Sequence, residues 1–235
     1  MNAQVATTST SITGTDASAI GNSTTASGNY STAMGLSTTA QGLISTAMGQ
    51  NTTASGYAST SMGQHSTASG NYSTAMGWST TASGHNSLAT GKFAKASDFA
   101  STVIGHYNSS GSSVTDSATS FSTSNTAFVI GNGADVSNKS DAFKVMFNGD
   151  TTISNDLTVS GDIVISSDAR LKSNIVTLGS TLPKLLQIDG KSYEMKGKQK
   201  IGVLAQEIQE VFPELVTKDD NEMLAVNYQG LVPVL

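Results

Sequence analysis

The amino-acid sequence predicts a mainly β protein. It consists of a parallel β-solenoid of fourteen-residue coils, then a short β connector and a small α+β C-terminal domain. Three observations predict it: a seven-residue repeat from Ile12 to Gly105, alternation of small and larger side chains within each repeat, and a change of composition after residue 165. The repeat is interpreted first, because a fixed period defines the structural unit that is stacked.

Glycine recurs every seventh residue through this region and is replaced only at Asp98. Two residues before each glycine the side chain is small, nearly always alanine, and four before it stands serine or threonine in most repeats. The residue directly before glycine alternates between apolar and polar, which doubles the period to fourteen. The apolar positions include Ile20, Met34, Met48, Met62, Met76 and Ile104; the polar ones include Ser27, Gln41, Ser55, Ser69 and Ser83.

A helical interpretation of the seven-residue period fails. A coiled coil needs two apolar positions per heptad with good helix formers between them, and each glycine would cost about 1 kcal/mol relative to alanine in a helix. In a strand, serine and alanine of S-T-A-M-G face one way, and threonine and methionine face the other. Glycine then provides either a positive φ or a close backbone approach at the turns. We therefore expect six to seven coils, stacked about 4.8 Å apart, with the methionines in one ladder.

The S-x-A-x-G pattern resembles the head repeats of trimeric autotransporter adhesins. The resemblance implies a left-handed β-roll, a homotrimer of three parallel rolls, and an apolar sheet facing the trimer axis. It places Met34, Met48, Met62 and Met76 at the trimer interface. A core of alanine and serine buries little apolar area at about 25 cal/mol per Å², and an exposed methionine stripe needs a partner. A monomeric roll with surface methionines is the alternative.

Composition narrows the class of function. The chain has 235 residues, a net charge of −5 and no cysteine, which excludes disulfides and thiolate metal sites. No charged residue lies between Asp16 and Lys92, as expected where like charges would stack on adjacent rungs. His65, His85 and His106 fall at turns and do not form a ladder, so we expect no metal and no cofactor. The sequence has neither the basic clusters typical of nucleic-acid partners nor the apolar length required for membrane insertion.

The domains are expected in the order 1–11 lead-in, 12–105 roll, 106–165 linker and connector, and 166–235 C-terminal domain. Residues 106–123 are serine-rich and predict an irregular linker. Strands are expected at 127–131 and 142–147, the second turning at Asn148-Gly149, and two shorter ones at 152–153 and 157–159. The run F-V-I-G-N-G from Phe128, followed by A-F-K-V-M-F-N-G-D from Ala142, resembles the connector that precedes the chaperone module in many tail-fibre proteins.

Three motifs characterise residues 166–235. S-S-D-A-R-L-K runs from Ser166 to Lys172, I-G-V-L-A-Q-E begins at Ile201, and V-N-Y spans Val226–Tyr228. In this order they resemble the C-terminal intramolecular chaperone of phage endosialidases, tailspikes and tail fibres. The chain stops at Leu235, where that family continues into a long helix, so we expect this domain to be truncated.

The local pattern of this domain predicts a hairpin and a helix. Strands at 191–195 and 199–203 flank Lys196-Gly197-Lys198, and Leu204, Ile208 and Val211 share one helical face until Pro213 ends the helix.

The chaperone resemblance implies a serine–lysine dyad. Ser167 is the nucleophile, Lys172 is its base, and the Ser166–Ser167 peptide bond is cut, with Asp168 and Arg170 as supporting residues. A hydroxyl becomes a useful nucleophile when a neutral amine takes its proton, and lysine is neutral only where desolvation or a nearby cation such as Arg170 lowers the pKa of its ammonium. We expect Ser167 to cap a helix that carries Lys172; the alternative is that Ser167 and Asp168 serve only as a helix N-cap.

These observations favour a homotrimeric structural fibre that contacts a host or environmental surface receptor, such as a glycan, through variable turns. As an enzyme it is at most a single-turnover serine peptidase acting on itself. Residues 1–10 lack a secretory signal, which favours a virion tail fibre over an extracellular or cell-surface protein. Two alternatives stay open. One is an ice-binding or glycan-decorated solenoid that uses Thr25, Thr39, Thr53, Thr67 and Thr81; the other is a trimeric bacterial adhesin.

Overall fold

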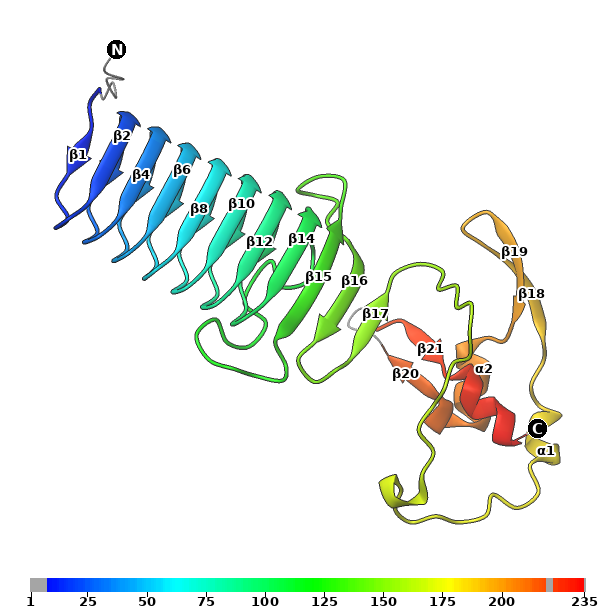
Figure 1. The fold of residues 1–235 in the computed structure, drawn as a ribbon. Helices are drawn as coiled ribbons and strands as arrows, with labels where there is room; N and C mark the ends of the chain where they lie inside the picture. Colours follow the sequence, from blue (N-terminus) through cyan, green and yellow to red (C-terminus); the bar gives the residue numbers. More distant parts are fainter. Residues whose placement is uncertain (1–7, 219–221, 235) are drawn as a thin grey trace. The chain divides into compact units, whose positions relative to one another are not determined.

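The computed structural model describes residues 8–218 and 222–234 (Figure 1). The chain forms two compact units, Met1–Ser160 and Gly161–Leu235. The second unit therefore begins a few residues before Ser166, the domain boundary expected from the sequence.

The first unit is a parallel β-solenoid in which each coil contributes one short and one long strand, and successive coils stack in a regular row (Figure 1). The short strands form a seven-stranded sheet of β1 (Ser11–Ile12), β3 (Thr25–Ala26), β5 (Thr39–Ala40), β7 (Thr53–Ala54), β9 (Thr67–Ala68), β11 (Thr81–Ala82) and β13 (Lys95–Ala96). The long strands of the coils are β2 (Ser18–Asn22), β4 (Thr32–Leu36), β6 (Thr46–Gln50), β8 (Thr60–Gln64), β10 (Thr74–Trp78), β12 (Leu88–Lys92) and β14 (Thr102–His106). The mainly β class and the fourteen-residue coil are confirmed.

Strand register aligns equivalent residues of successive coils. Met34 pairs with Met48, Met48 with Met62, and Met62 with Met76. Within a strand the expected alternation also holds, because Ser31 and Ala33 are buried whereas Thr32 and Met34 are not. The methionine ladder predicted from the repeat is thus a feature of the fold.

The interior of the roll is narrow and polar. Within the repeated coils its fully buried side chains are alanines and hydroxyl residues, and Val103 of β14 and Val129 of the following strand take the alanine position at the end of the roll. Buried hydroxyls without a hydrogen-bond partner among the described residues are those of Thr24, Ser31, Thr38, Ser45, Thr52, Ser59 and Ser87. Because unpaired buried hydroxyls oppose folding and alanine buries little area, this interior is a weak source of stability.

The two sets of glycines have different physical roles. Gly35 and its equivalents at the ends of the long strands have positive φ, for example +127° at Gly35 and +112° at Gly49. Gly42 and its equivalents after the short strands do not have positive φ, yet a Cβ on Gly42 would lie 1.9 Å from the Gly56 carbonyl oxygen of the next coil. The first set provides the turn, and both sets provide the close approach between coils.

The roll continues beyond Gly105. β15 (Thr126–Asn132) pairs in parallel with β14, and β16 (Asp141–Met146) and β17 (Thr151–Ile153) then add antiparallel strands to the same sheet. The strands expected near 127–131, 142–147 and 152–153 are present. The strand expected at 157–159 is wrong, because these residues form no sheet pairing and their side chains are exposed.

The second unit contains short elements around a small core. They are η1 (Ala169–Leu171), α1 (Leu182–Leu185), β18 (Lys191–Met195), β19 (Lys198–Gly202), α2 (Ala205–Val211), η2 (Pro213–Leu215), β20 (Val216–Lys218), β21 (Leu224–Val226) and η3 (Tyr228–Val234). Ile208, Phe212 and Val234 form the core. The expected hairpin is confirmed as β18–β19. The expected helix is α2, but Leu204 is its N-cap and is 44% exposed, so only Ile208 and Val211 of the predicted face pack inward.

Candidate functional site

The structure brings Ser167 and Lys172 together. The Lys172 ammonium donates a hydrogen bond to the Ser167 hydroxyl, with 2.7 Å between Nζ and Oγ. Both residues are exposed in the single chain. The pair therefore has the contact that a serine nucleophile and its base require, in a setting open to water.

A single 3₁₀ turn, η1, creates this contact. The expectation that Ser167 caps a helix holding Lys172 is wrong in detail, because Asp168 is the N-cap and Lys172 is the C-cap, with extended backbone at φ −120° and ψ 147°. Asp168 accepts the backbone N–H of Arg170 at 2.8 Å, the capping contact that aspartate favours. The tight turn returns the chain on itself, so the lysine reaches across it to Ser167.

Asp168 also holds the side chain of Arg170. The guanidinium donates two hydrogen bonds to the Asp168 carboxylate, 3.0 Å from Nε to Oδ1 and 2.7 Å from the terminal nitrogen to Oδ2. These bonds and the backbone bond from Arg170 lower the pKa of Asp168, and the carboxylate raises the pKa of Arg170. Arg170 is thus paired with an anion, which weakens its expected effect as a cation on Lys172.

The Ser–Lys pair lines a cavity of about 670 Å³ within the second unit. One side consists of Ile163, Ile165, Ser166, Ser167 and Lys172. Residues of the V-N-Y region and of η3 form the other side, among them Asn227, Gly230, Val232 and Pro233. The residues on the acyl side of the predicted cut, up to Ser166, and the Ser–Lys pair therefore face one shared space.

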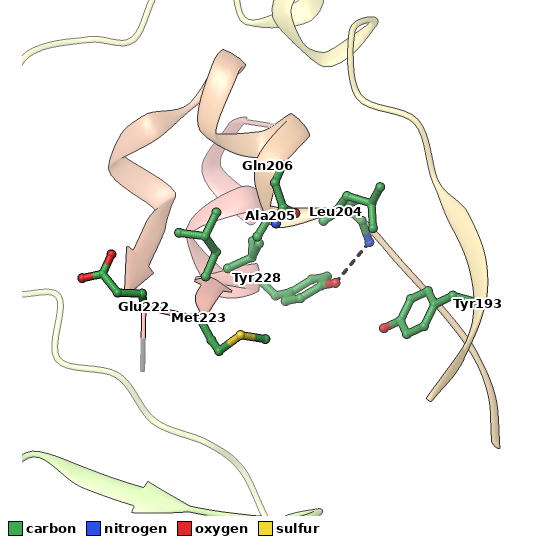
Figure 2. A pocket seen from close by; sticks show the side chains of 10 residues that line it. Tyr193, Leu204, Ala205, Gln206, Glu222, Met223 and Tyr228 are labelled. Carbon is green, nitrogen blue, oxygen red and sulfur yellow. Dashed lines mark hydrogen bonds between the residues drawn. The ribbon is translucent and has the colours of Figure 1, made fainter. Parts of the chain in front are cut away.

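A separate pocket of about 400 Å³ is lined by residues of β18, the start of α2, β21 and the start of η3 (Figure 2). Tyr193 and Tyr228 point toward one another across it, and the Tyr228 hydroxyl accepts the Val203 N–H at 3.1 Å. A Cβ on Gly202 would lie 2.6 Å from the Tyr228 hydroxyl oxygen and 3.1 Å from that of Tyr193. The I-G-V and V-N-Y motifs therefore contact each other here, which makes this pocket part of the packing of the domain.

The predicted interface methionines lie on the outer face of the long-strand sheet. Met34 is 41% exposed, and Met48, Met62 and Met76 are half-buried by their neighbours in the ladder. In the single chain this leaves an apolar stripe along the coils.

An aromatic cluster lies where the last coils turn after their long strands. It consists of Trp78, Lys92, Phe93 and Tyr107. Trp78 and Phe93 meet edge to face with centroids 5.3 Å apart, and Phe93 stacks on Tyr107 at 4.8 Å. The Lys92 ammonium lies 4.7 Å from the Trp78 ring centroid. Phe93 and Tyr107 both have positive φ, which is rare for bulky residues.

His65 and His85 lie in bends and turns between strands, whereas His106 is the last residue of β14 and its Nδ1 contacts the Gly133 carbonyl oxygen at 2.8 Å. Across residues 8–218 and 222–234, no group of three His, Cys, Asp or Glu side chains is arranged to hold a metal ion. In the same ranges, no helix has the length and apolar character to cross a membrane.

Sequence reasoning missed the role of Asp98. Its carboxylate is fully buried and accepts hydrogen bonds from the Thr115 N–H at 2.6 Å, the Thr115 hydroxyl at 2.7 Å and the Thr126 N–H at 2.9 Å. Asn108 and Asn125 bind the backbone of the same region through their side chains. Residues 107–125 are irregular as expected, but they close the end of the roll and are not a loose linker. The signal that could have found this role is the single lapse of the glycine repeat.

Stacked coils followed by a small domain with a Ser–Lys pair define a repeat-built fibre-type protein with a C-terminal accessory domain. Comparison with protein families supports this class of protein for both parts of the chain. Residues 13–38, 40–66, 54–80, 68–94 and 82–108 match the YadA head domain repeat (two copies), and residues 167–217 match the chaperone of endosialidase family. No curated protein matches the chain. The two family matches, at the two ends expected from the sequence, support a trimeric adhesin or surface-exposed fibre with a C-terminal chaperone domain.

Proposed function

We propose that this chain is a fibre protein, carried on a virion tail or a cell surface, that attaches to a host or environmental receptor. Three rolls pack side by side as a homotrimer, the C-terminal domain assists their assembly, and the domain then cuts itself off between Ser166 and Ser167. The single observation that carries the self-cleavage is the 2.7 Å contact between Lys172 Nζ and Ser167 Oγ, placed directly after the bond to be cut.

Trimer assembly is supported by apolar surface in both units. The methionine stripe runs along the roll, and in the second unit Ile201 is 86% exposed, Val176 81% and Leu186 77%. A contiguous apolar stripe such as the methionine ladder indicates a contact with another chain. Thin repetitive rolls can pair out of register, so a non-repetitive domain that assembles first would set the alignment of the three chains.

The self-cleavage proceeds in two steps that balance. A neutral Lys172 amine takes the Ser167 Oγ proton as Oγ bonds to the Ser166 carbonyl carbon; the C–N bond then breaks, and the proton passes to the Ser167 nitrogen. This leaves an ester between Ser166 and the Ser167 oxygen, which water hydrolyses to a Ser166 carboxylate and a free Ser167 amino group. Because both side chains are exposed in the single chain, a neighbouring subunit must cover them to favour the neutral amine.

Intact-mass spectrometry on four proteins tests this proposal. The wild-type chain should release a fragment beginning at Ser167, and Ser167→Ala and Lys172→Ala should remain whole. Ser166→Ala should cut normally, because that residue contributes only its carbonyl group. The rate of cleavage should not change when the assembled trimer is diluted, because the reaction is intramolecular. A wild-type trimer that stays whole after prolonged incubation would overturn the cleavage and leave the chaperone role standing.

A second candidate rests on the short-strand sheet. Thr25, Thr39, Thr53, Thr67 and Thr81 are aligned in register on successive coils, and such a hydroxyl row suits an ice surface or attached glycans. Thermal hysteresis of the purified protein in cooled solution would support ice binding, and its absence at millimolar protein would exclude it.

A further inference from the structure

The extended segment before the predicted cut has two sides with different surroundings. Ile163 and Ile165 line the cavity that holds the Ser–Lys pair, whereas Val164 does not. The exposed fractions follow the same alternation, at 61% for Ile163, 90% for Val164 and 59% for Ile165. Ile163 and Ile165 therefore share the side of this segment that faces the cavity, and Val164 does not.

The opposite wall offers an apolar surface to that side. Val232 and Pro233 of η3 line the cavity together with Ile163 and Ile165. Their backbone is held in place locally: the Asn227 side chain accepts the Gly230 N–H at 3.1 Å, and a Cβ on Gly230 would lie 2.4 Å from a Leu215 methyl carbon. The wall is therefore fixed against η2, independently of the segment that it faces.

We propose that Ile163 and Ile165 are positioning residues, which anchor the acyl side of the Ser166–Ser167 bond against Val232 and Pro233. This inference rests on the self-cleavage proposed above and specifies how the bond is presented. A serine adjacent to its own target bond still needs a fixed carbonyl orientation, because small misplacements of reacting groups lower rates steeply. Residues 163–165 and 227–233 lie outside the segment that matches the chaperone family, so the match does not assign them this role.

Val164 lies between Ile163 and Ile165 but does not line the cavity, so it provides a matched control. Ile163→Ser and Ile165→Ser should each slow the release of the Ser167 fragment by on the order of tenfold to a hundredfold, and Val164→Ser should cut at the wild-type rate. Ile165→Leu should recover most of the rate. Light scattering and thermal melting, both in a Ser167→Ala background, should show the same trimer and the same melting temperature for all variants, which separates positioning from folding.

A reciprocal variant keeps the test decisive if Ile165→Ser does not assemble. Val232→Ser alters the other wall, and combining it with Ile163→Ser should slow cleavage less than the product of the two single effects, because contacting residues are not additive. Equal rates for the Ile163, Val164 and Ile165 variants would overturn the positioning role while leaving self-cleavage intact. A wild-type chain that never cuts would overturn both.

Discussion

Thr126 donates its backbone N–H to the buried carboxylate of Asp98, with 2.9 Å between Thr126 N and Oδ2. Asp98 occupies the position that glycine holds in every earlier coil of the short-strand side. At Gly84, one coil before, a Cβ would lie 2.0 Å from the Asp98 carbonyl oxygen. Because β13 is the last strand of its sheet, Asp98 has no further coil above it, and its side chain uses the free space to bind the closing segment.

Removing this carboxylate should destabilise the end of the roll. Asp98→Ala leaves the Thr115 donors and the buried Thr126 N–H without their acceptor, and the loss at the buried Thr126 donor alone costs about 1–3 kcal/mol. Asp98→Gly, which restores the repeat residue, should be equally harmful. Thermal unfolding followed by circular dichroism checks this, with the exposed Asp116→Ala as the control. An Asp98→Gly protein as stable as wild type would show that the carboxylate is dispensable.

Adding one methyl group to a glycine inside the stack should disrupt the roll. Gly42→Ala places a carbon 1.9 Å from the Gly56 carbonyl oxygen, and two adjacent coils must separate, at a cost of more than the roughly 1–3 kcal/mol of ordinary overpacking. Gly161→Ala is the control, since a Cβ there has nothing within 4 Å. We expect a clearly lower melting temperature for the first variant only; equal melting curves would contradict the close approach.

Charges on the methionine stripe should prevent assembly of the proposed trimer. Met48→Glu with Met62→Glu would bury like charges between subunits, and unpaired buried charge costs several kcal/mol for each ion. The matched control is Gln50→Glu with Gln64→Glu, which adds the same charges to the same two coils at exposed positions. Light scattering should find monomer or aggregate for the first protein and trimer for the second. A trimeric methionine variant would place the interface elsewhere.

The Asp168–Arg170 pair should be visible in a titration. Hydrogen bonds from Arg170 lower the pKa of Asp168. The carboxylate therefore stays ionised to a lower pH than an ordinary aspartate, and the pair is lost only as the pH falls through this lowered pKa. Arg170→Ala removes the side-chain bonds and should move the pKa of Asp168 back toward its ordinary value. Carboxyl chemical shifts measured by NMR from neutral to acid pH check this, and an unchanged midpoint would contradict it.

Much of the roll could be predicted because its sequence is periodic. The alternation around Met34 and the small interior at Ala33 follow directly from the side-chain period of a strand. The role of Asp98 did not follow, because a single lapse in a repeat does not reveal which distant backbone groups it binds. The same limit applies to the strand expected at 157–159, where local propensity is not matched by any pairing partner.

For the candidate site, the sequence predicted the two residues of the pair but not their surroundings. The S-S-D-A-R-L-K motif identified Ser167 and Lys172, and the structure places them in hydrogen-bond contact. The sequence offered Ser167 and Asp168 together as a possible N-cap, and Asp168 is the cap of η1. It did not reveal that Asp168 also binds the Arg170 side chain, because a turn of three residues has no periodicity to detect. The opposite wall at Val232 depends on contacts between residues far apart in the chain, which spacing alone does not encode.

The register of the coils also determines how such a protein can change in length. Each coil pairs with the coil before it and the coil after it in the same register, so that Met48 aligns with Met34 on one side and with Met62 on the other. Inserting or deleting fourteen residues would therefore lengthen or shorten the shaft by one step of about 4.8 Å, without altering the closing segment around Asp98 or the C-terminal unit. Within the repeats, insertions that are not a multiple of fourteen residues would shift the later strands out of this alignment; β15 keeps its register with β14 across a longer connection only because the irregular segment around Asp98 lies between them. The length of the roll therefore changes in steps of one coil, and the duplication or deletion of one whole coil is the smallest change that keeps the strand register.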